Sequence, residues 1–394
     1  MKSIRLGCLF FLWMLLPLSA AAPARAAQPL NVAEPQINYR FGEVLLIESH
    51  LLEDSHPTDL SIFWQVRGEA RVNQSPVQLN PAGDIAYQHD LAQTPLPVFV
   101  TVDFWFGGTL PNGQAATSAK FTFIYTDNRF EWQSIETETF HIHWYQGDLA
   151  YAQDALNAAQ AGLQRIQGFI HTDTAAPIEI YAYASAREVQ TALNLSGQSL
   201  TAGHANPQWG IVLVSLPPGN EQRLEMERLI PHELLHILLY RNLGERYNRL
   251  PVWLHEGLAS MAELRPNAEY GVILQTAYAQ DGLMPFTNLC STFPRDASGA
   301  VLAYAQSDSF VRFITTEYGA SKLETLLQRY ADGLTCERAP AAAFGASLTQ
   351  IESQWQQTLF NANPWQTAMQ NHLAWLVLLA LLLLTPLINF LRPH

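Results

Sequence analysis

The stretch His232-Glu-Leu-Leu-His236 carries two histidines four positions apart, with a glutamate directly after the first. Residues four apart lie on one face of an α-helix, so both imidazoles can bind the same metal ion. Glu233 lies where a carboxylate can accept a proton from a water on that metal. The surrounding run 229–240 is otherwise apolar. Burying these polar groups without a metal would cost on the order of several kcal/mol, so the stretch predicts a metal-binding helix rather than a chance motif.

A second stretch, Trp253-Leu-His-Glu-Gly257, supplies a carboxylate 20 positions after the second histidine. It opens an apolar segment that is predicted to be a helix over 253–264. Together with the two histidines, Glu256 completes a His₂Glu donor set, which leaves one coordination position of a zinc ion open. His255 points about 100° away from Glu256 around such a helix, so we do not expect it to be a ligand.

These motifs resemble those of the gluzincin metallopeptidases, specifically the peptidase MA-like group related to the aminopeptidase-N family. Those enzymes carry H-E-x-x-H followed by W-L-x-E-G at a similar distance. A third stretch, 303–314, resembles the family's pattern around a tyrosine that donates a hydrogen bond to the oxyanion. The resemblance implies Zn²⁺, one per chain, with Glu233 as general base and Tyr304 at the oxyanion. The implied zinc ligands are His232, His236 and Glu256. For Tyr304 the alternative is an amphipathic-helix tyrosine that is half in the core.

The chain departs from the aminopeptidase pattern near the metal-binding helix. The sequence G-x-M-E-N, which binds the free amine of a substrate in those enzymes, is absent, so an endopeptidase is expected. In its place stands Gly210-Ile-Val-Leu-Val-Ser-Leu216, predicted to be an edge strand that pairs with an extended substrate. Pro231 either kinks the metal-binding helix or lies in its first turn. Ser307 or Asp308 is expected to orient a ligand histidine.

The two ends of the chain predict export and membrane anchoring. Residues 1–27 have a basic start, an apolar run and a small-residue cleavage site, which is typical of a secretory signal peptide. Residues 372–391 are almost entirely apolar and long enough to span a bilayer about 30 Å thick, so we expect one transmembrane helix after the linker 362–371. A buried core helix is the alternative. Arg392 indicates a short cytoplasmic C-terminus, which places the catalytic domain outside a cell that, by resemblance, is bacterial.

The net charge limits which classes of molecule can be partners of this chain. The formal net charge is −13, and it becomes −16 when Lys2, Arg5 and Arg25 leave with the signal peptide. No cluster of Lys and Arg is present, which argues against nucleic acid as a partner. A peptide or protein substrate and the membrane are therefore the expected partners, and the oligomeric state is open.

Whether Cys290 and Cys336 form a disulfide is also open, since their compartment permits one.

Residues 28–131 are predicted to form an all-β, immunoglobulin-like or fibronectin-like sandwich that acts as a spacer or packing domain rather than as a ligand-binding module. Turn residues separate its short alternating runs, which lie at 43–49, 61–66, 98–105 and 121–125.

Residues 132–361 are predicted to be the peptidase MA-like zinc domain, with a helical C-terminal lobe as in gluzincins. Strands are expected at 138–145 and 177–183, and helices at 148–169, 185–195, 301–317, 321–331 and 347–360. His141 and His143 share one face of the first strand and are expected at its surface. The whole chain is thus predicted to be an α+β, membrane-anchored zinc metallopeptidase. A non-catalytic zinc-containing surface binding protein is the first alternative, and a zinc hydrolase for a non-peptide substrate is the second.

Overall fold

The computed structural model describes residues 27–52, 57–196 and 203–360. The predicted signal peptide (apart from Ala27), the linker and the predicted transmembrane helix lie outside these residues. Within the described part, none of the helices is both long and apolar enough to cross a membrane. Contacts between Cα atoms divide the chain into two compact units. The first contains Leu45–His89 and Val102–Phe123 together with the chain up to Asn38, and the second contains Tyr39–Val44, Asp90–Thr101 and the chain from Ile124. The predicted domain limits at 131 and 361 stay a prediction.

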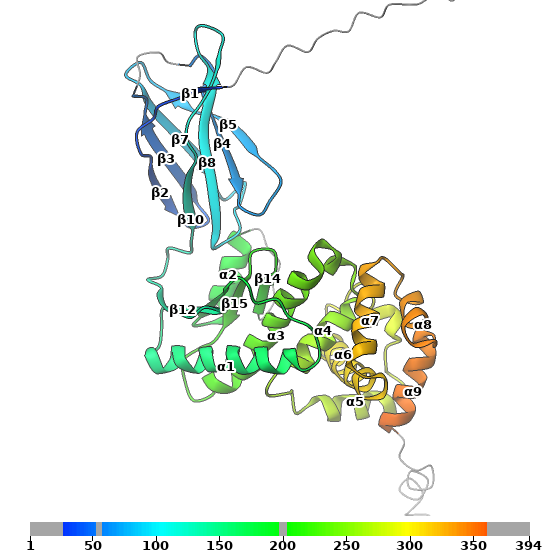
Figure 1. Cartoon of the computed structure of the whole chain (residues 1–394). Coiled ribbons are helices and arrows are strands. Elements are labelled where there is room, and N and C mark those ends of the chain that lie inside the picture. Colours follow the sequence, from blue (N-terminus) through cyan, green and yellow to red (C-terminus); the bar gives the residue numbers. More distant parts are fainter. Residues whose placement is uncertain (1–26, 53–56, 197–202, 361–394) are drawn as a thin grey trace, which may run out of the picture. The chain divides into compact units, whose positions relative to one another are not determined.

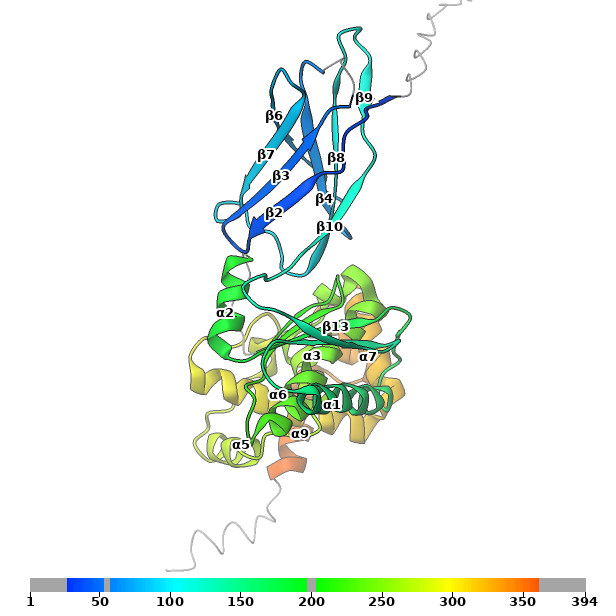
Figure 2. The same ribbon diagram turned by 90° about the vertical axis from the view of Figure 1, so that its left-hand side faces the viewer.

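Two β-sheets in two layers make up the first unit (Figures 1 and 2). The larger sheet has the order β1 (Gln28–Pro29), β9 (Ala115–Thr117), β8 (Val100–Thr109), β4 (Ser61–Val66) and β5 (Asn73–Pro76), with β10 (Phe121–Tyr125) also paired to β8. The smaller sheet has the order β2 (Gln36–Arg40), β3 (Val44–His50), β7 (Asp84–Asp90) and β6 (Gln78–Leu79). Alternate residues such as Ile47, Ile62 and Phe104 are buried, as the alternating runs predict. The four predicted strands are confirmed, with small shifts at their ends.

A five-stranded sheet forms the first half of the second unit. Its order is β11 (Gln133–Glu136), β12 (Phe140–Trp144), β13 (Ile178–Tyr183), β15 (Ile211–Ser215) and β14 (Gly203–Asn206). The three inner strands are parallel and the two outer ones antiparallel. The prediction that 210–216 contains an edge strand is wrong, because β15 lies between β13 and β14. Val212 and Leu213 point to opposite faces of β15 and both are fully buried, as in a central strand.

Three helices accompany this sheet, namely α1 (Leu149–Gln167), α2 (Ala186–Leu195) and α3 (Gln222–Leu243). Helices α1 and α3 pack side by side against one face of the sheet (Figures 1 and 2). Pro231 lies inside α3 and not in its first turn, which excludes one of the two predicted alternatives. A Cβ atom added to Gly162 of α1 would lie 2.8 Å from Cβ and Cγ of Pro231. The glycine therefore lets α1 come close to the proline of α3.

The second half of this unit is the predicted helical lobe. It contains α4 (Val252–Ala262), α5 (Tyr270–Ala279), α6 (Ala297–Tyr318), α7 (Ala320–Ala331), α8 (Arg338–Phe344) and α9 (Leu348–Phe360). Helices α5 and α8 were not expected, and the other four agree with the prediction. Buried aromatic rings join these helices, with Phe286 stacked on Phe310 and both in contact with Trp253 and Trp355. This aromatic core fixes α4 against α6.

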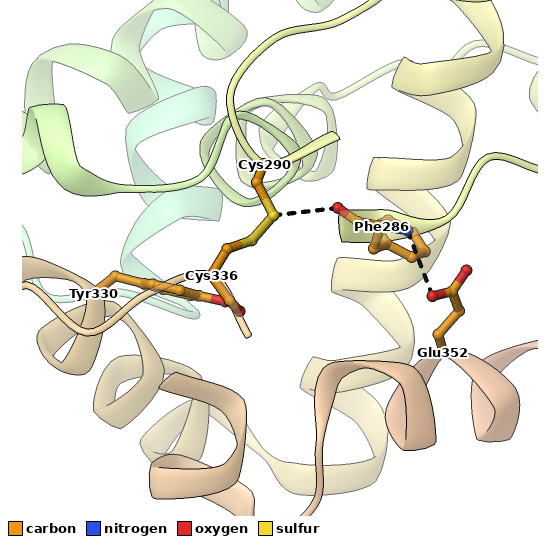
Figure 3. Close-up of a disulfide and its surroundings, with 5 residues drawn as sticks. All are labelled: Phe286, Cys290, Tyr330, Cys336 and Glu352. Carbon is orange, nitrogen blue, oxygen red and sulfur yellow. Dashed lines mark hydrogen bonds between the residues drawn. A yellow bond between two sulfur atoms is a disulfide. The ribbon is translucent and has the colours of Figure 1, made fainter. Parts of the chain in front are cut away.

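A disulfide joins Cys290 to Cys336, with their Cα atoms 6.1 Å apart (Figure 3). It links the segment that follows the short helix Phe286–Leu289 to the segment that precedes α8. The carbonyl of Cys290 accepts a hydrogen bond from the N–H of Val252, the first residue of α4. The bond that the sequence leaves open is therefore present, and it lies at the start of the helix that carries Glu256.

Candidate metal centre

Helix α3 places two imidazoles on one face and α4 brings a carboxylate to them. The ring centroids of His232 and His236 are 5.4 Å apart, one helical turn along α3. Oε2 of Glu256 lies 3.4 Å from Nε2 of His232 and 4.0 Å from Nε2 of His236. The ligand atoms of these three residues all lie within 4.8 Å of one another. Among the described residues they are the group that can bind a metal ion.

The second ring nitrogen of each histidine, Nδ1, contacts a residue other than Glu256. Nδ1 of His232 lies 3.1 Å from Oε1 of Glu263, and Nδ1 of His236 lies 3.0 Å from the hydroxyl of Tyr247. A neutral imidazole that offers its Nε2 lone pair to a metal carries its proton on Nδ1. Both imidazoles can therefore donate from Nδ1 to an oxygen and keep Nε2 directed at Glu256.

A metal ion fits this arrangement. Oε2 of Glu256 is buried and has no hydrogen-bond partner in the described part of the chain. A buried carboxylate oxygen without a hydrogen bond is costly, and a metal ion between it and the two Nε2 atoms would remove that cost. Two imidazole nitrogens and one carboxylate oxygen are also a donor set that divalent transition metals accept.

The buried charges depend strongly on one another. Burial lowers the pKa of His236 to about 3. Burial also opposes a charge on His232, but Glu256 and Glu263 outweigh it and raise the pKa of His232 to about 10. Burial likewise opposes the charge of Glu256, yet the neighbouring histidines bring the pKa of that carboxyl well below its usual range. A metal ion would thus have to displace a proton from His232, as is usual for metal sites.

Glu233 lies in the same cavity, facing strand β14. A backbone hydrogen bond from Ala205 reaches its carboxylate, and burial raises the pKa of Glu233 to about 7. A Cβ atom on Gly203 would collide with Oε1 of Glu233, so only glycine leaves room for the carboxylate at that position. The edge strand of the sheet, and not β15, therefore lies next to the predicted general base.

Tyr304 of α6 lines the cavity as well. Its ring centroid lies 6.3 Å from that of His232, and Phe293 packs against it edge-on at 5.1 Å. Burial raises the pKa of Tyr304 well above its usual range, so its hydroxyl stays protonated and can donate a hydrogen bond. The structure thus brings all five predicted site residues to one cavity of about 590 Å³.

The predicted roles of Ser307 and Asp308 are wrong. Asp308 binds Nε of Arg312 on the same helix, at 2.9 Å, and Ser307 Oγ makes no hydrogen bond among the described residues. Glu263 and Tyr247 occupy the orienting positions instead. A sequence signal exists for Glu263, which follows Glu256 by seven residues, or two turns of the helix that is predicted over 253–264. No such signal exists for Tyr247, which lies in the 3₁₀ helix Gly244–Arg249.

The remaining histidines do not join the metal group. His255 is enclosed between His236 and Tyr247, with ring centroids at 5.5 Å and 5.7 Å. His141 and His143 are half-buried rather than at the surface, and each binds one oxygen of Glu179, at 2.8 Å and 2.6 Å. That cluster forms a hydrogen-bonded network on the sheet.

Two helical histidines, a carboxylate from a second helix and an adjacent glutamate define the class of metal-dependent hydrolases. The chain matches the family model of the Peptidase MA superfamily over residues 158–361, a range that contains every residue of this site. The protein belongs to the Peptidase MA superfamily. A search of curated proteins finds no match.

Solved structures offer only distant similarities. One is titled "Myokine structure", with 14% identity over 26% of this chain and 99% of that chain and a TM-score of 0.20. Another is a β-1,3-glucan-binding carbohydrate-binding module of family 56, with 14% identity over 24% of this chain and 98% of that chain and a TM-score of 0.17. A third is a purple acid phosphatase from yellow lupin (Lupinus luteus) seeds, with 11% identity over 52% of this chain and 41% of that chain and a TM-score of 0.22. These scores are too low to support a conclusion about fold or function.

Proposed function

We propose that the protein is a zinc-dependent metallopeptidase that cleaves peptide bonds within a chain. The observation that carries the proposal is the orientation of the two imidazoles. Nδ1 of His232 contacts Glu263 and Nδ1 of His236 contacts Tyr247, so both Nε2 atoms face the buried Oε2 of Glu256, which has no hydrogen bond within the described residues. The His₂Glu set is typical of catalytic zinc in peptidases, where it leaves a position for substrate.

Each residue has a definite task in such a reaction. Zinc bound by His232, His236 and Glu256 would supply a Lewis acid and lower the pKa of water. Glu233 accepts a proton from the attacking water and passes it to the leaving amine. The hydroxyl of Tyr304 donates a hydrogen bond to the oxyanion that develops on the carbonyl.

Internal cleavage is supported by the carboxylates of the cavity. Three carboxylates line it in the described part of the chain, namely Glu233, Glu256 and Glu263. The first is the proposed base, the second a proposed ligand, and the third binds His232. None remains to bind the free amine at a substrate's end, as an aminopeptidase requires. An extended peptide would instead lie along the outer strand β14, whose residues Gly203, His204 and Ala205 line the cavity.

We further propose that the protein acts outside a bacterial cell, anchored by residues 372–391 after removal of residues 1–27. The composition of these two segments supports this placement. The two β-sheets of the first unit are proposed to be an immunoglobulin-like spacer, and the zinc domain to be related to the aminopeptidase-N family. The short motifs W-L-x-E-G and the tyrosine pattern support that relation.

The test compares metal binding with turnover in two variants of the purified chain. Glu233→Gln is expected to keep one zinc per chain and to lose turnover by roughly 10²–10⁴-fold, the usual contribution of a general base. His236→Ala is expected to lose the metal. The readouts are zinc content and cleavage of a random peptide mixture with and without chelator. Zinc without any cleavage by the unaltered chain would favour the non-catalytic binding protein, and cleavage of ester or amide probes alone would favour a non-peptide hydrolase.

A further inference from the structure

Arg228 is the one Lys or Arg side chain that lines the cavity within the described residues. It lies on α3 one turn before His232, so the two side chains share a face of the helix. Four residues of helix rise place the arginine about 6 Å along the axis from the first proposed ligand. Two uncharged polar residues, Asn267 and Tyr270, also line the cavity. Arg228 is therefore a cation in a cavity that three carboxylates also line.

The guanidinium of Arg228 has N–H donors that its contact with Glu225 does not use. Its Nη2 atom donates to Oε2 of Glu225 at 2.8 Å, and the Arg228 side chain is 38% exposed. A partly exposed ion pair between residues three apart on a helix is weak. It can orient the arginine without using all of its N–H donors. A guanidinium has five N–H donors in a fixed fork that matches a carboxylate. The remaining donors of Arg228 are available to a group that enters the cavity.

We propose that Arg228 binds a carboxylate of the substrate one or two residues from the cleaved bond, and so sets the specificity of this site. The inference rests on the proposed peptidase function. An extended peptide advances about 3.3 Å per residue, so the distance of roughly 6 Å between Arg228 and His232 corresponds to about two residues. The carboxylate can belong to an Asp or Glu side chain or to the C-terminus of the substrate.

The experiment uses the zinc-loaded full chain and a peptide found to be cleaved in a random mixture. Four sets of matched peptides carry Glu or Gln at each of the two positions on either side of the cleaved bond, with an amidated C-terminus. A further pair has a free or an amidated C-terminus close to that bond. The expected result is a roughly tenfold higher kcat/KM for the carboxylate at one position, as for a charge-assisted hydrogen bond in a partly exposed site.

Arg228→Ala is expected to abolish that preference, so that the peptides with Glu and with Gln have equal kcat/KM. Glu225→Gln is the matched control, because it removes the negative charge beside the arginine and keeps the cation. It should retain or increase the preference. Zinc content and thermal unfolding of each variant show that the fold is kept. Binding of the same peptides to Glu233→Gln protein, measured by calorimetry, gives a readout that does not depend on turnover.

The outcomes separate the two proposals. A preference that survives in Arg228→Ala, or the absence of any preference, overturns the role of Arg228 and leaves the peptidase function intact. If no peptide is cleaved, the peptidase function fails. Calorimetry with one peptide of fixed sequence, prepared with Glu or Gln inside it and with a free or an amidated C-terminus, then decides whether Arg228 recognises a carboxylate. A preference confined to the free C-terminus supports the role of Arg228 and identifies the terminal carboxylate as its source, which contradicts cleavage within a chain.

Discussion

The carboxylate of Glu263 lies 3.1 Å from Nδ1 of His232, although 31 positions separate the two residues. Glu263 directly follows the last residue of α4, and its side chain is buried. The same helix carries Glu256, whose Oε2 faces Nε2 of His232. Helix α4 and the residue directly after it therefore contact both nitrogens of one imidazole, the helix through the proposed ligand Glu256 and Glu263 through the carboxylate that orients the ring.

Removing this orienting group should weaken metal binding. Glu263→Ala is expected to reduce zinc affinity roughly 10–100-fold, because the imidazole of His232 loses the acceptor that fixes its tautomer. The affinity is measured by competition with a coloured chelator. Glu263→Gln keeps an oxygen acceptor without the charge, so its zinc affinity should lie between that of the original chain and that of Glu263→Ala. An unchanged affinity in Glu263→Ala would contradict the orienting role.

Tyr304 should affect catalysis and not the metal. Tyr304→Phe is expected to lower kcat roughly 10²–10³-fold, as for loss of one oxyanion donor, with zinc affinity unchanged. If Tyr304 is only a core residue, the substitution should change the free energy of unfolding and leave kcat near its original value. Steady-state kinetics and urea unfolding of the same variant distinguish the two.

Gly257 should tolerate no side chain. A Cβ atom there would lie 2.5 Å from the carbonyl oxygen of Ser307 and 2.6 Å from Cγ2 of Val311, so α4 could not stay in contact with α6. Gly257→Ala is expected to cost about 1–3 kcal/mol in the free energy of unfolding, and to weaken zinc binding because Glu256 is the neighbouring residue. Gly271→Ala in α5 is the control, since its Cβ would meet no atom within 4 Å. That change should be neutral or stabilising.

The contacts of Glu179 with His141 and His143 should make the free energy of unfolding depend on pH in the acid range. Burial raises the pKa of Glu179, but His143 and His141 outweigh it, so the pKa is lowered in the folded protein. A lowered pKa adds stability that is fully present above the unfolded value, near 4.5, and is lost as pH falls through the folded value. Glu179→Gln is therefore expected to be less stable than the original chain at neutral pH, with a difference that shrinks below about pH 4.5. Urea unfolding between pH 3 and 7 measures this, and a difference that is constant with pH would refute it.

The parts of the site that depend on helical spacing follow from the sequence alone. His232 and His236 share a face at any place where the chain is helical, and Glu256 follows on a second apolar segment. The helical lobe is likewise predictable because each of its long helices has an apolar periodicity. Helix α5 buries only Leu274 and α8 is seven residues long, so the apolar pattern of each is weak.

Other features depend on which segments become neighbours. The apolar run of β15 gives no sign that the polar segment Gly203–Asn206 will cover its edge, so the edge strand was predicted in the wrong place. Tyr247 reaches His236 only because a 3₁₀ turn bends the chain back after α3. The pairing of two cysteines 46 positions apart depends in the same way on a distance that no local pattern contains.

The bond between Cys290 and Cys336 closes a covalent loop that includes all of α6 and therefore Tyr304. A single proteolytic cut inside that loop would leave both fragments joined through sulfur. The proposed ligands on α3 and α4 would then stay in one molecule with Tyr304. A protein that hydrolyses peptide bonds is exposed to cleavage by its own copies, and in this chain one such nick would not separate the tyrosine from the metal site.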